Sequence, residues 1–309
     1  MTLRIGLFGG ASGAESQSAT DPVSSLVEAV VAAEADGFPC FWTSQIFTVD
    51  ALTALAVAGA RTSSIELGTA VVPVHPRHPH VLAQQALTVN AAVGGRLALG
   101  IGLSHQIVVE GMWGLSFDRP YTYMRQYLDA LLPLLSEQAV AAEGDMLTVR
   151  AQIQLPGVAA PSVLLAALGE RMLGLAGART AGTITWMTGP ATLRDHIVPT
   201  ITRAAEGAGR DAPRVVAGFP VCVTDDPAAA RKAAGDTFAI YGQLPSYRAM
   251  LDREGAGGPA DVAIVGDEKE VAGRFEELDA AGVTDLGVGT FGSEEDRART
   301  HRFLRDQLA

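Results

Sequence analysis

The sequence predicts an α/β fold, a (β/α)8 TIM barrel with insertions, on the basis of three observations. Eight short apolar runs alternate with longer segments of helical periodicity. The apolar runs are continuous, without regular polar alternation, which is typical of strands buried on both faces of a parallel sheet. The length of 309 residues suits one barrel of about 250 residues with insertions. A doubly wound open sheet is the structural alternative, although it usually needs fewer strands.

The first half of the chain begins directly with an expected strand over 3–8. Asp21 and Pro22 begin the helix that follows, because Asp caps helices and Pro suits the first turn, and Gly37 ends it. The helix expected over 120–142 is the longest and carries leucines at helical spacing. The other expected strands of this half are 38–44, 64–72 and 96–102, and the other expected helices are 50–61 and 79–92.

The second half continues the same alternation. Two segments, about 143–160 and about 243–262, fit neither kind of element and are interpreted as insertions. No linker divides the chain, so we expect a single domain over 1–309. The expected strands are 162–167, 183–188, 214–224 and 284–290, and the expected helices are 169–180, 190–208, one from about Asp226, 267–281 and 293–308.

Composition and charge exclude several functional classes. Hydrophobic residues are 48% and charged residues 18% of the chain, a balance that excludes a disordered protein. The net charge of −11 makes nucleic acid a poor partner, because phosphate binding needs basic side chains. No long apolar run and no cationic leader is present, so we expect no membrane contact and a cytoplasmic location. Cys40 and Cys222 are far apart, which indicates core residues and no disulfide framework.

Several common motifs are absent or incomplete. The sequence holds neither a phosphate-binding GxxxxGK loop nor the GxSxG turn that presents a nucleophilic serine. The run GIGLSH over 100–105 begins like a dinucleotide-binding turn, but His105 occupies the third glycine position. His75, His78 and His80 lie in PVHPRHPH, where no nearby carboxylate completes a metal site. We interpret this segment as a loop at the carboxyl ends of the strands and expect no metal.

The end of the strand over 96–102 admits a structural and a functional interpretation. Gly100 and Gly102 are expected there either because the strand end packs tightly or because a planar ligand lies against the backbone. His105 follows in the next loop, either as a structural group or as a general acid, since its ordinary pKa lies near neutrality.

A second feature is the passage from strand to helix at Leu168-Gly169. The free N–H groups and the dipole of a helix N-terminus can bind an anion, and Arg171 could reinforce that site. Without further support, an ordinary strand-to-helix turn explains the same pattern.

Together these segments resemble the luciferase-like monooxygenase superfamily, the barrel flavin enzymes that include bacterial luciferase. The resemblance covers nearly the whole chain and is greatest for the branch that uses the deazaflavin coenzyme F420. The segments that carry it are GTAVVPVHPRHPHVLAQQALTVNAAVGGRLALGIGLSH (68–105), LLAALGERMLGLAGARTAGTITWMTGP (164–190) and DVAIVGDEKEVAGRFEELDAAGVTDLGVG (261–289).

The resemblance implies a coenzyme site at the carboxyl ends of the strands. Relatives often carry an Asp-His pair after the second strand, where this chain has Ser44-Gln45, so the role of that histidine does not transfer. Relatives have a non-prolyl cis peptide in the third strand, which corresponds to Ala70–Val71. His105 corresponds to a glutamate acid in the phosphosugar dehydrogenase of the family. The other residues that correspond to coenzyme contacts are Gly100, Gly102, Ala166, Ala167, Leu168, Gly169, Met172, Gly182, Thr183 and Ile184.

The implied function is that of a coenzyme F420-dependent oxidoreductase. A deazaflavin moves a hydride, so we expect reduction of a C=C or C=N bond of a small metabolite, with His105 or water supplying the proton. The lysines that bind sugar phosphate in relatives have no evident counterparts, since Lys232 and Lys269 are the only lysines. The residues available for a mostly apolar cavity are Phe47, Met112, Trp113, Phe117, Tyr121, Trp186 and Met187.

Two alternatives stay open. The same barrel serves FMN-dependent monooxygenases, in which FMN replaces the deazaflavin. The chain could also be a non-catalytic flavin-binding relative, but such relatives tend to lose barrel segments, whereas this chain keeps all eight expected strands. Members of the family are commonly dimers, so the resemblance implies a homodimer that acts on a small molecule.

Overall fold

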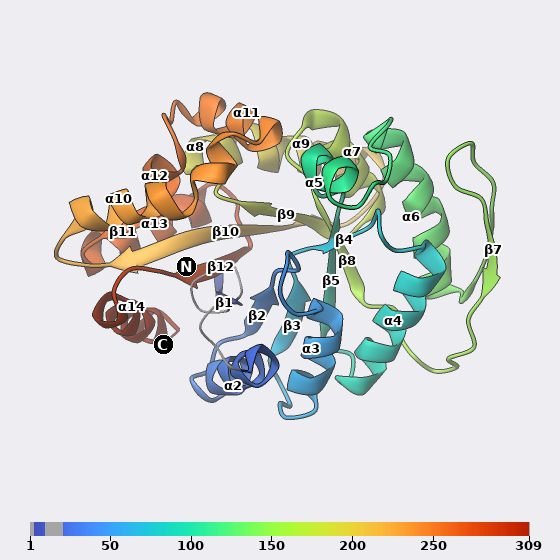
Figure 1. Ribbon diagram of the computed structural model, residues 1–309, viewed down its shortest axis with the longest axis horizontal. Helices are drawn as coiled ribbons and strands as arrows, with labels where there is room; N and C mark the ends of the chain where they lie inside the picture. Colours follow the sequence, from blue (N-terminus) through green and yellow to red (C-terminus); the bar gives the residue numbers. More distant parts are fainter. Residues whose placement is uncertain (1–2, 10–20, 309) are drawn as a thin grey trace.

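The computed structural model of the protein describes residues 3–9 and 21–308. Within that part of the chain, eight parallel strands close into a barrel, because β12 pairs with β1 on one side and with β10 on the other. The predicted (β/α)8 fold is confirmed, and its arrangement can be followed in Figure 1. In order of pairing, the barrel strands are β1 (Arg4–Gly9), β2 (Cys40–Thr43), β3 (Glu66–Thr69), β5 (Leu97–Gly102), β8 (Ser162–Ala166), β9 (Gly182–Trp186), β10 (Arg214–Val223) and β12 (Asp285–Thr290).

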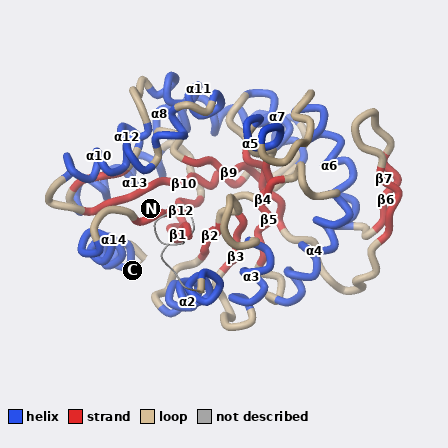
Figure 2. The backbone as a smooth tube through the Cα atoms, viewed as in Figure 1, coloured by secondary structure: helices blue, strands red, loops and turns tan. Residues whose placement is uncertain are grey.

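Helices lie around the outside of these strands, as Figure 2 shows. Several begin at the caps that the sequence places there. Asp21 accepts a hydrogen bond from the Ser24 N–H, and Asp50 accepts one from the Thr53 N–H. The helices that follow barrel strands are α2 (Pro22–Ala35), α3 (Ala51–Gly59), α4 (Pro79–Ala92), α6 (Pro120–Ser136), α7 (Glu170–Arg179), α8 (Pro190–Thr192), α9 (Val198–Gly207), α10 (Pro227–Thr237), α13 (Glu268–Ala280) and α14 (Glu294–Asp306), with a π-helical turn over Leu193–Ile197 between α8 and α9.

The longest helix is shorter than the sequence predicts. The prediction over 120–142 is wrong at its end, because α6 ends at Ser136 and β6 (Ala139–Ala142) pairs antiparallel with β7 (Val149–Gln152). Gln138 adopts a left-handed backbone conformation, with φ of 57°, which interrupts the helix. Its side-chain amide donates to the Leu155 carbonyl and accepts from the Leu155 N–H, at 2.7 and 2.8 Å. The resulting hairpin lies at the edge of the molecule, beside α6 (Figure 1).

Two short elements extend the carboxyl end of the barrel. The peptide bond between Ala70 and Val71 is cis, as the resemblance implies, and it separates β3 from β4 (Val72–Pro73), which pairs with β5. The chain then leaves β5 through Ser104 into a short helix, α5 (Gln106–Gly111), which the sequence did not indicate.

The segment after β10 holds further elements. Besides α10 it contains a 3-10 turn over Ala239–Gly242, α11 (Pro245–Glu254), α12 (Pro259–Val262) and a short strand, β11 (Ile264–Gly266), which pairs with the end of β10. The expected insertion near 243–262 therefore consists largely of α11 and α12. Figure 1 shows these helices along one end of the barrel.

The barrel interior is filled by large aromatic side chains that glycines make room for. Trp42 is fully buried, and a Cβ on Gly68 would lie 2.1 Å from its ring. At the amino ends of the strands, Arg214 forms ion pairs with Asp285, which is 1% exposed, and with Glu66. The interior is thus a packed core, which leaves the carboxyl ends of the strands as the open side of the barrel.

Cys40 and Cys222 are both buried and unpaired, as predicted. Among the helices that the structure describes, none has the length and apolar character needed to cross a lipid bilayer.

Candidate active site

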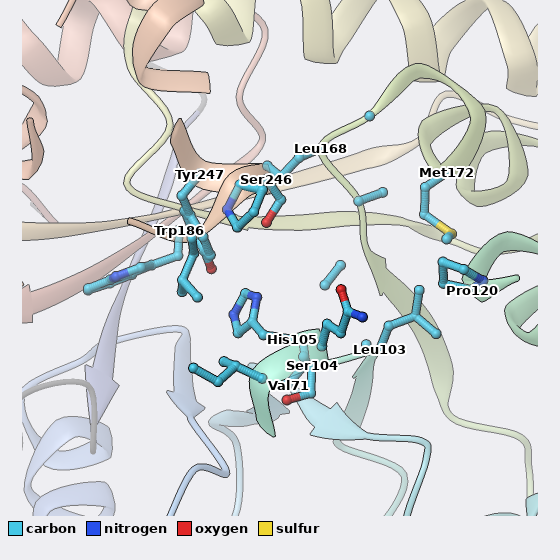
Figure 3. Close-up of a pocket in the computed structure, with 18 of the residues that line it drawn as sticks. Val71, Leu103, Ser104, His105, Pro120, Leu168, Met172, Trp186, Ser246 and Tyr247 are labelled. Atoms are coloured by element: carbon cyan, nitrogen blue, oxygen red, sulfur yellow. The ribbon is translucent and has the colours of Figure 1, made fainter. Parts of the chain in front are cut away.

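Two adjoining cavities lie at the carboxyl ends of the barrel strands. The larger has a volume of about 830 Å³ and the smaller about 520 Å³, both within the range of small-molecule sites. They share part of their lining, including Val71, His105, Trp186, Leu244 and Tyr247. Figure 3 shows many of these side chains converging on the space between β5, β8 and β9. In a barrel of this kind the active site is formed at this face.

One wall of the larger cavity is built from small and apolar residues. Val71, carried by the bulge between β3 and β4, lies over Gly102 and faces Ala166. A Cβ on Gly102 would be 2.7 Å from Val71 Cγ2 and 3.2 Å from Ala166 Cβ, so glycine is needed for this close packing. Ile184 continues the wall from β9. The result is a surface without charged side chains, which suits an aromatic ring system.

The N-terminus of α7 opens onto the same cavity. Leu168, Gly169 and Met172 line it, and Gly169 is the residue that begins the helix. No side chain caps this end, so the N–H groups of the first turn are available to a ligand. His196 Nε2 lies 2.8 Å from the Leu168 carbonyl oxygen, which fixes the turn before the helix. An apolar wall and an uncapped helix N-terminus therefore face the same cavity.

The structure brings most of the sequence-predicted residues together. Val71, Gly102, His105, Ala166, Ala167, Leu168, Gly169, Met172 and Ile184 line the larger cavity, and Ser44, Gln45, Ala70, Val71 and His105 line the smaller one.

Four predicted residues do not line either cavity. Arg171 is exposed and stacks over the Tyr121 ring at 4.2 Å. A Cβ on Gly100 would lie 2.0 Å from the Thr69 carbonyl oxygen, so this glycine permits the close approach of two strands. Gly182 and Thr183 begin β9 at the opposite, amino end of the barrel, and Thr183 Oγ1 donates to the Leu165 carbonyl at 2.8 Å. We assign these two a structural role.

Gln45 is held rigidly in the wall of the smaller cavity. Its Nε2 donates to Asp50 Oδ2 at 3.3 Å, and its Oε1 accepts from the Ala51 N–H at 3.2 Å. Both ends of the amide are therefore engaged by the start of α3. Ser44 beside it is buried, and neither side chain carries a charge.

Five of the seven apolar residues expected around the cavities line at least one of them, and two line neither. Phe47, Met112, Trp113 and Trp186 line the smaller cavity, and Phe117 and Trp186 line the larger one. Tyr121 lies under Arg171, and Met187 is buried outside both cavities.

His105 lies where the two cavities meet. It precedes α5, its side chain makes no cap hydrogen bond, and its ring centroid is 5.7 Å from that of Tyr247. Burial lowers the pKa of His105 below its ordinary value of 6.5, because the charged ring loses water. The imidazole is therefore mostly neutral at pH 7, and its ring is accessible to a ligand in either cavity.

The three histidines of PVHPRHPH do not converge. His75 Nδ1 lies 2.9 Å from the Leu103 carbonyl oxygen, and its ring stacks on Tyr123 with centroids 4.6 Å apart. His78 caps α4 and hydrogen-bonds the His80 N–H. In the described ranges 3–9 and 21–308, no three metal-ligating side chains come close enough to hold an ion.

The sequence did not identify the part of the site that comes from the segment before and within α11. Ile240, Leu244 and Tyr247 line both cavities, and Tyr241 lines the smaller one. Leu244 and Tyr247 belong to the insertion expected over about 243–262, Ile240 and Tyr241 lie just before it, and the segment carries no motif. Its two closely spaced tyrosines are the feature of the sequence that could have marked it.

The described lining is almost free of charge. Glu110, at the edge of the larger cavity, is the one ionised side chain among the described lining residues, and neither lysine nor arginine is among them. A ligand in the smaller cavity therefore meets hydroxyl groups, an imidazole and apolar side chains. This lining favours an uncharged molecule, because a buried charge needs a partner.

Comparison with known proteins agrees with this geometry. Residues 3–289 match the family described as luciferase-like monooxygenase. The 5,10-methylenetetrahydromethanopterin reductase of Methanolobus tindarius is 29% identical over 92% of this chain and 88% of its own length. A putative coenzyme F420-dependent oxidoreductase of Mycobacterium tuberculosis is 29% identical over 89% of this chain and 92% of its own. The coenzyme F420-dependent tetrahydromethanopterin reductase of Methanopyrus kandleri has the same fold, with a TM-score of 0.80, 21% identity, and coverage of 98% and 97% of the two chains.

Proposed function

Because the chain belongs to the luciferase-like monooxygenase family, we propose that it is an oxidoreductase dependent on coenzyme F420. The observation that carries the proposal is the larger cavity, in which an apolar wall adjoins the uncapped N-terminus of α7. A deazaflavin coenzyme needs both features, a surface for its ring and donors for its phosphate. The names of two relatives, which specify coenzyme F420, support the same choice.

Different residues would hold the ring and the anionic part of the coenzyme. Val71, Gly102 and Ala166 form the surface for the ring, with Ala70 and Ile184 at its borders. The anionic part of the coenzyme would lie at the first turn of α7, next to Leu168, Gly169 and Met172, where backbone N–H groups point outward. Ser44 and Gln45 would close the far side.

The smaller cavity is the proposed substrate site. When bound, the reduced coenzyme supplies a hydride, and the protein orients both partners, excludes water and provides a proton. The substrate is a small, mostly apolar metabolite with a C=C or C=N bond, because the described lining of this cavity carries no ionised side chain. His105, or a water beside it, is the proposed proton donor. A sugar phosphate does not suit this lining, since no basic side chain is available to neutralise it.

The test is a binding titration of the purified protein with coenzyme F420 and with FMN, followed by fluorescence quenching. Two variants at Gly169 test whether the phosphate of the coenzyme binds at the N-terminus of α7. Gly169→Asp and Gly169→Asn both provide a helix cap, and a Cβ at Gly169 meets no atom within 4 Å. Only the aspartate adds a negative charge beside the proposed phosphate position, so it should weaken F420 binding about tenfold relative to asparagine. Tight binding of FMN with none of F420 would overturn the proposal.

We also propose, from the family resemblance, that the protein is a homodimer that acts in the cytoplasm. Light scattering after gel filtration should then give a molar mass about twice the 32.1 kDa of the chain.

A further inference from the structure

The wall shared by the two cavities contains a phenol that the proposed function leaves unused. Tyr247 lies in the first turn of α11 and lines both cavities. Figure 3 shows it next to His105, although the two residues come from opposite sides of the site. The other side chains shared by both cavities are mostly apolar, including Val71 and Leu244. Tyr247 therefore places a polar group where a substrate and a coenzyme would meet.

The ring of Tyr247 is held in place by its neighbours. It packs edge-on against Tyr241, with ring centroids 4.9 Å apart. Its centroid also lies 5.7 Å from that of the His105 ring, which is tilted relative to it. Among the described residues, neither the Tyr247 hydroxyl nor the His105 ring has a hydrogen-bond partner. Phenols enclosed by protein nearly always find a partner, so a hydroxyl kept open to a cavity indicates a ligand acceptor.

The chemistry of the group restricts what it can recognise. Burial raises the pKa of Tyr247 above its ordinary value of 10, so the hydroxyl stays protonated and can donate. The donor is neutral, and no lysine or arginine is among the described lining residues. A carboxylate or phosphate would bring an uncompensated charge into this space, whereas a carbonyl oxygen would not.

We propose that the Tyr247 hydroxyl donates a hydrogen bond to the carbonyl oxygen of the substrate, an uncharged compound in which the carbonyl is conjugated to a C=C bond. This inference rests on the proposed function and narrows its substrate class.

A hydride that the reduced coenzyme would give up, itself becoming oxidised, adds to the β-carbon of the conjugated system, and the electron pair of the C=C bond moves toward the carbonyl, where negative charge develops on oxygen. The Tyr247 O–H stabilises that charge, and a proton from His105 or water goes to the α-carbon. The product is the saturated carbonyl compound. A fixed donor at developing negative charge contributes on the order of 100-fold to turnover.

The experiment uses cyclohexenone as the probe. Tyr247→Phe retains the ring and its packing but removes the hydroxyl. Tyr123→Phe is the matched control, since Tyr123 stacks on His75 and lines neither cavity. The isotope-edited infrared spectrum of bound cyclohexenone reports the carbonyl directly, without turnover. We expect the C=O stretching frequency of cyclohexenone bound to the wild type or to Tyr123→Phe to be lower than that of unbound cyclohexenone. In Tyr247→Phe this frequency should return toward the unbound value.

The second readout is reduction of cyclohexenone by the protein with reduced coenzyme F420. Tyr247→Phe should lower kcat about 100-fold and leave coenzyme affinity within about twofold. A wild type that does not bind cyclohexenone, or a carbonyl band that Tyr247→Phe leaves unchanged, would overturn the inference. A band shift that depends on Tyr247 without any hydride transfer would support the inference and contradict the proposed function.

Discussion

Replacing Gly102 by alanine tests how closely the wall of the larger cavity is packed. The new Cβ would lie 2.7 Å from Val71 Cγ2, closer than carbon atoms approach in folded proteins, and 3.2 Å from Ala166 Cβ. Val71 must therefore shift by several tenths of an ångström, into the cavity. Overpacking of this kind costs about 1–3 kcal/mol in the free energy of unfolding.

A second substitution shows whether Val71 is the cause. In Gly102→Ala/Val71→Ala the nearest remaining atom of residue 71 is its Cβ, 3.9 Å from the new methyl group, which is an ordinary contact. Val71→Ala alone should cost about 1 kcal/mol, because it removes two partly buried methyl groups. The double variant should then be about as stable as Val71→Ala alone, so the two substitutions couple favourably by about 1–3 kcal/mol, the whole cost of Gly102→Ala.

Urea unfolding of the four proteins, followed by tryptophan fluorescence, measures these differences. Gly273→Ala is the control, since it lies inside α13 with open space around it and should stabilise the protein by about 0.5–1 kcal/mol. The same Gly102→Ala protein should bind coenzyme F420 more weakly than the wild type. If the destabilisation of the double variant equals the sum of the two single destabilisations to within about 0.5 kcal/mol, the packing argument is refuted.

Three further predictions concern single side chains. Burial alone would raise the pKa of Glu34, but three backbone N–H groups donate to its Oε1 and lower the pKa to about 2. The ionised Glu34 carboxylate should therefore stabilise the fold above about pH 4.5 and lose this effect as the pH falls to about 2. Glu34→Gln should flatten that part of a curve of unfolding free energy against pH. Asp285→Asn should cost about 1–3 kcal/mol in urea unfolding, because it removes a buried carboxylate that accepts from Arg214, which keeps its ion pair with Glu66. A cost below about 0.5 kcal/mol would contradict this. If His105 is the acid, turnover should fall as pH rises through a pKa below 6.5, and His105→Ala should abolish that dependence; turnover unchanged at every pH would exclude the role.

Much of the fold could be predicted because each element carries its own local signal. The barrel strands are continuous apolar runs, and helices such as those begun by Asp21 and Asp50 have caps that bond the first turn. The end of α6 was missed because nothing in the local composition marks Gln138 as left-handed. Its conformation is supported by hydrogen bonds to Leu155, 17 residues along the chain.

The sequence alone determined the barrel, and it placed Val71, Gly102 and Ala166 at the carboxyl ends of recognisable strands, where they line the larger cavity. The family resemblance implied a coenzyme contact at Gly182, but the structure places this residue at the amino end of β9, where it lines neither cavity. Only the tertiary structure placed Tyr247 against His105, 142 positions earlier in the chain. Strand and helix patterns arise from contacts between near neighbours in sequence, whereas this pair depends on closure of the barrel and on how α11 packs across its mouth.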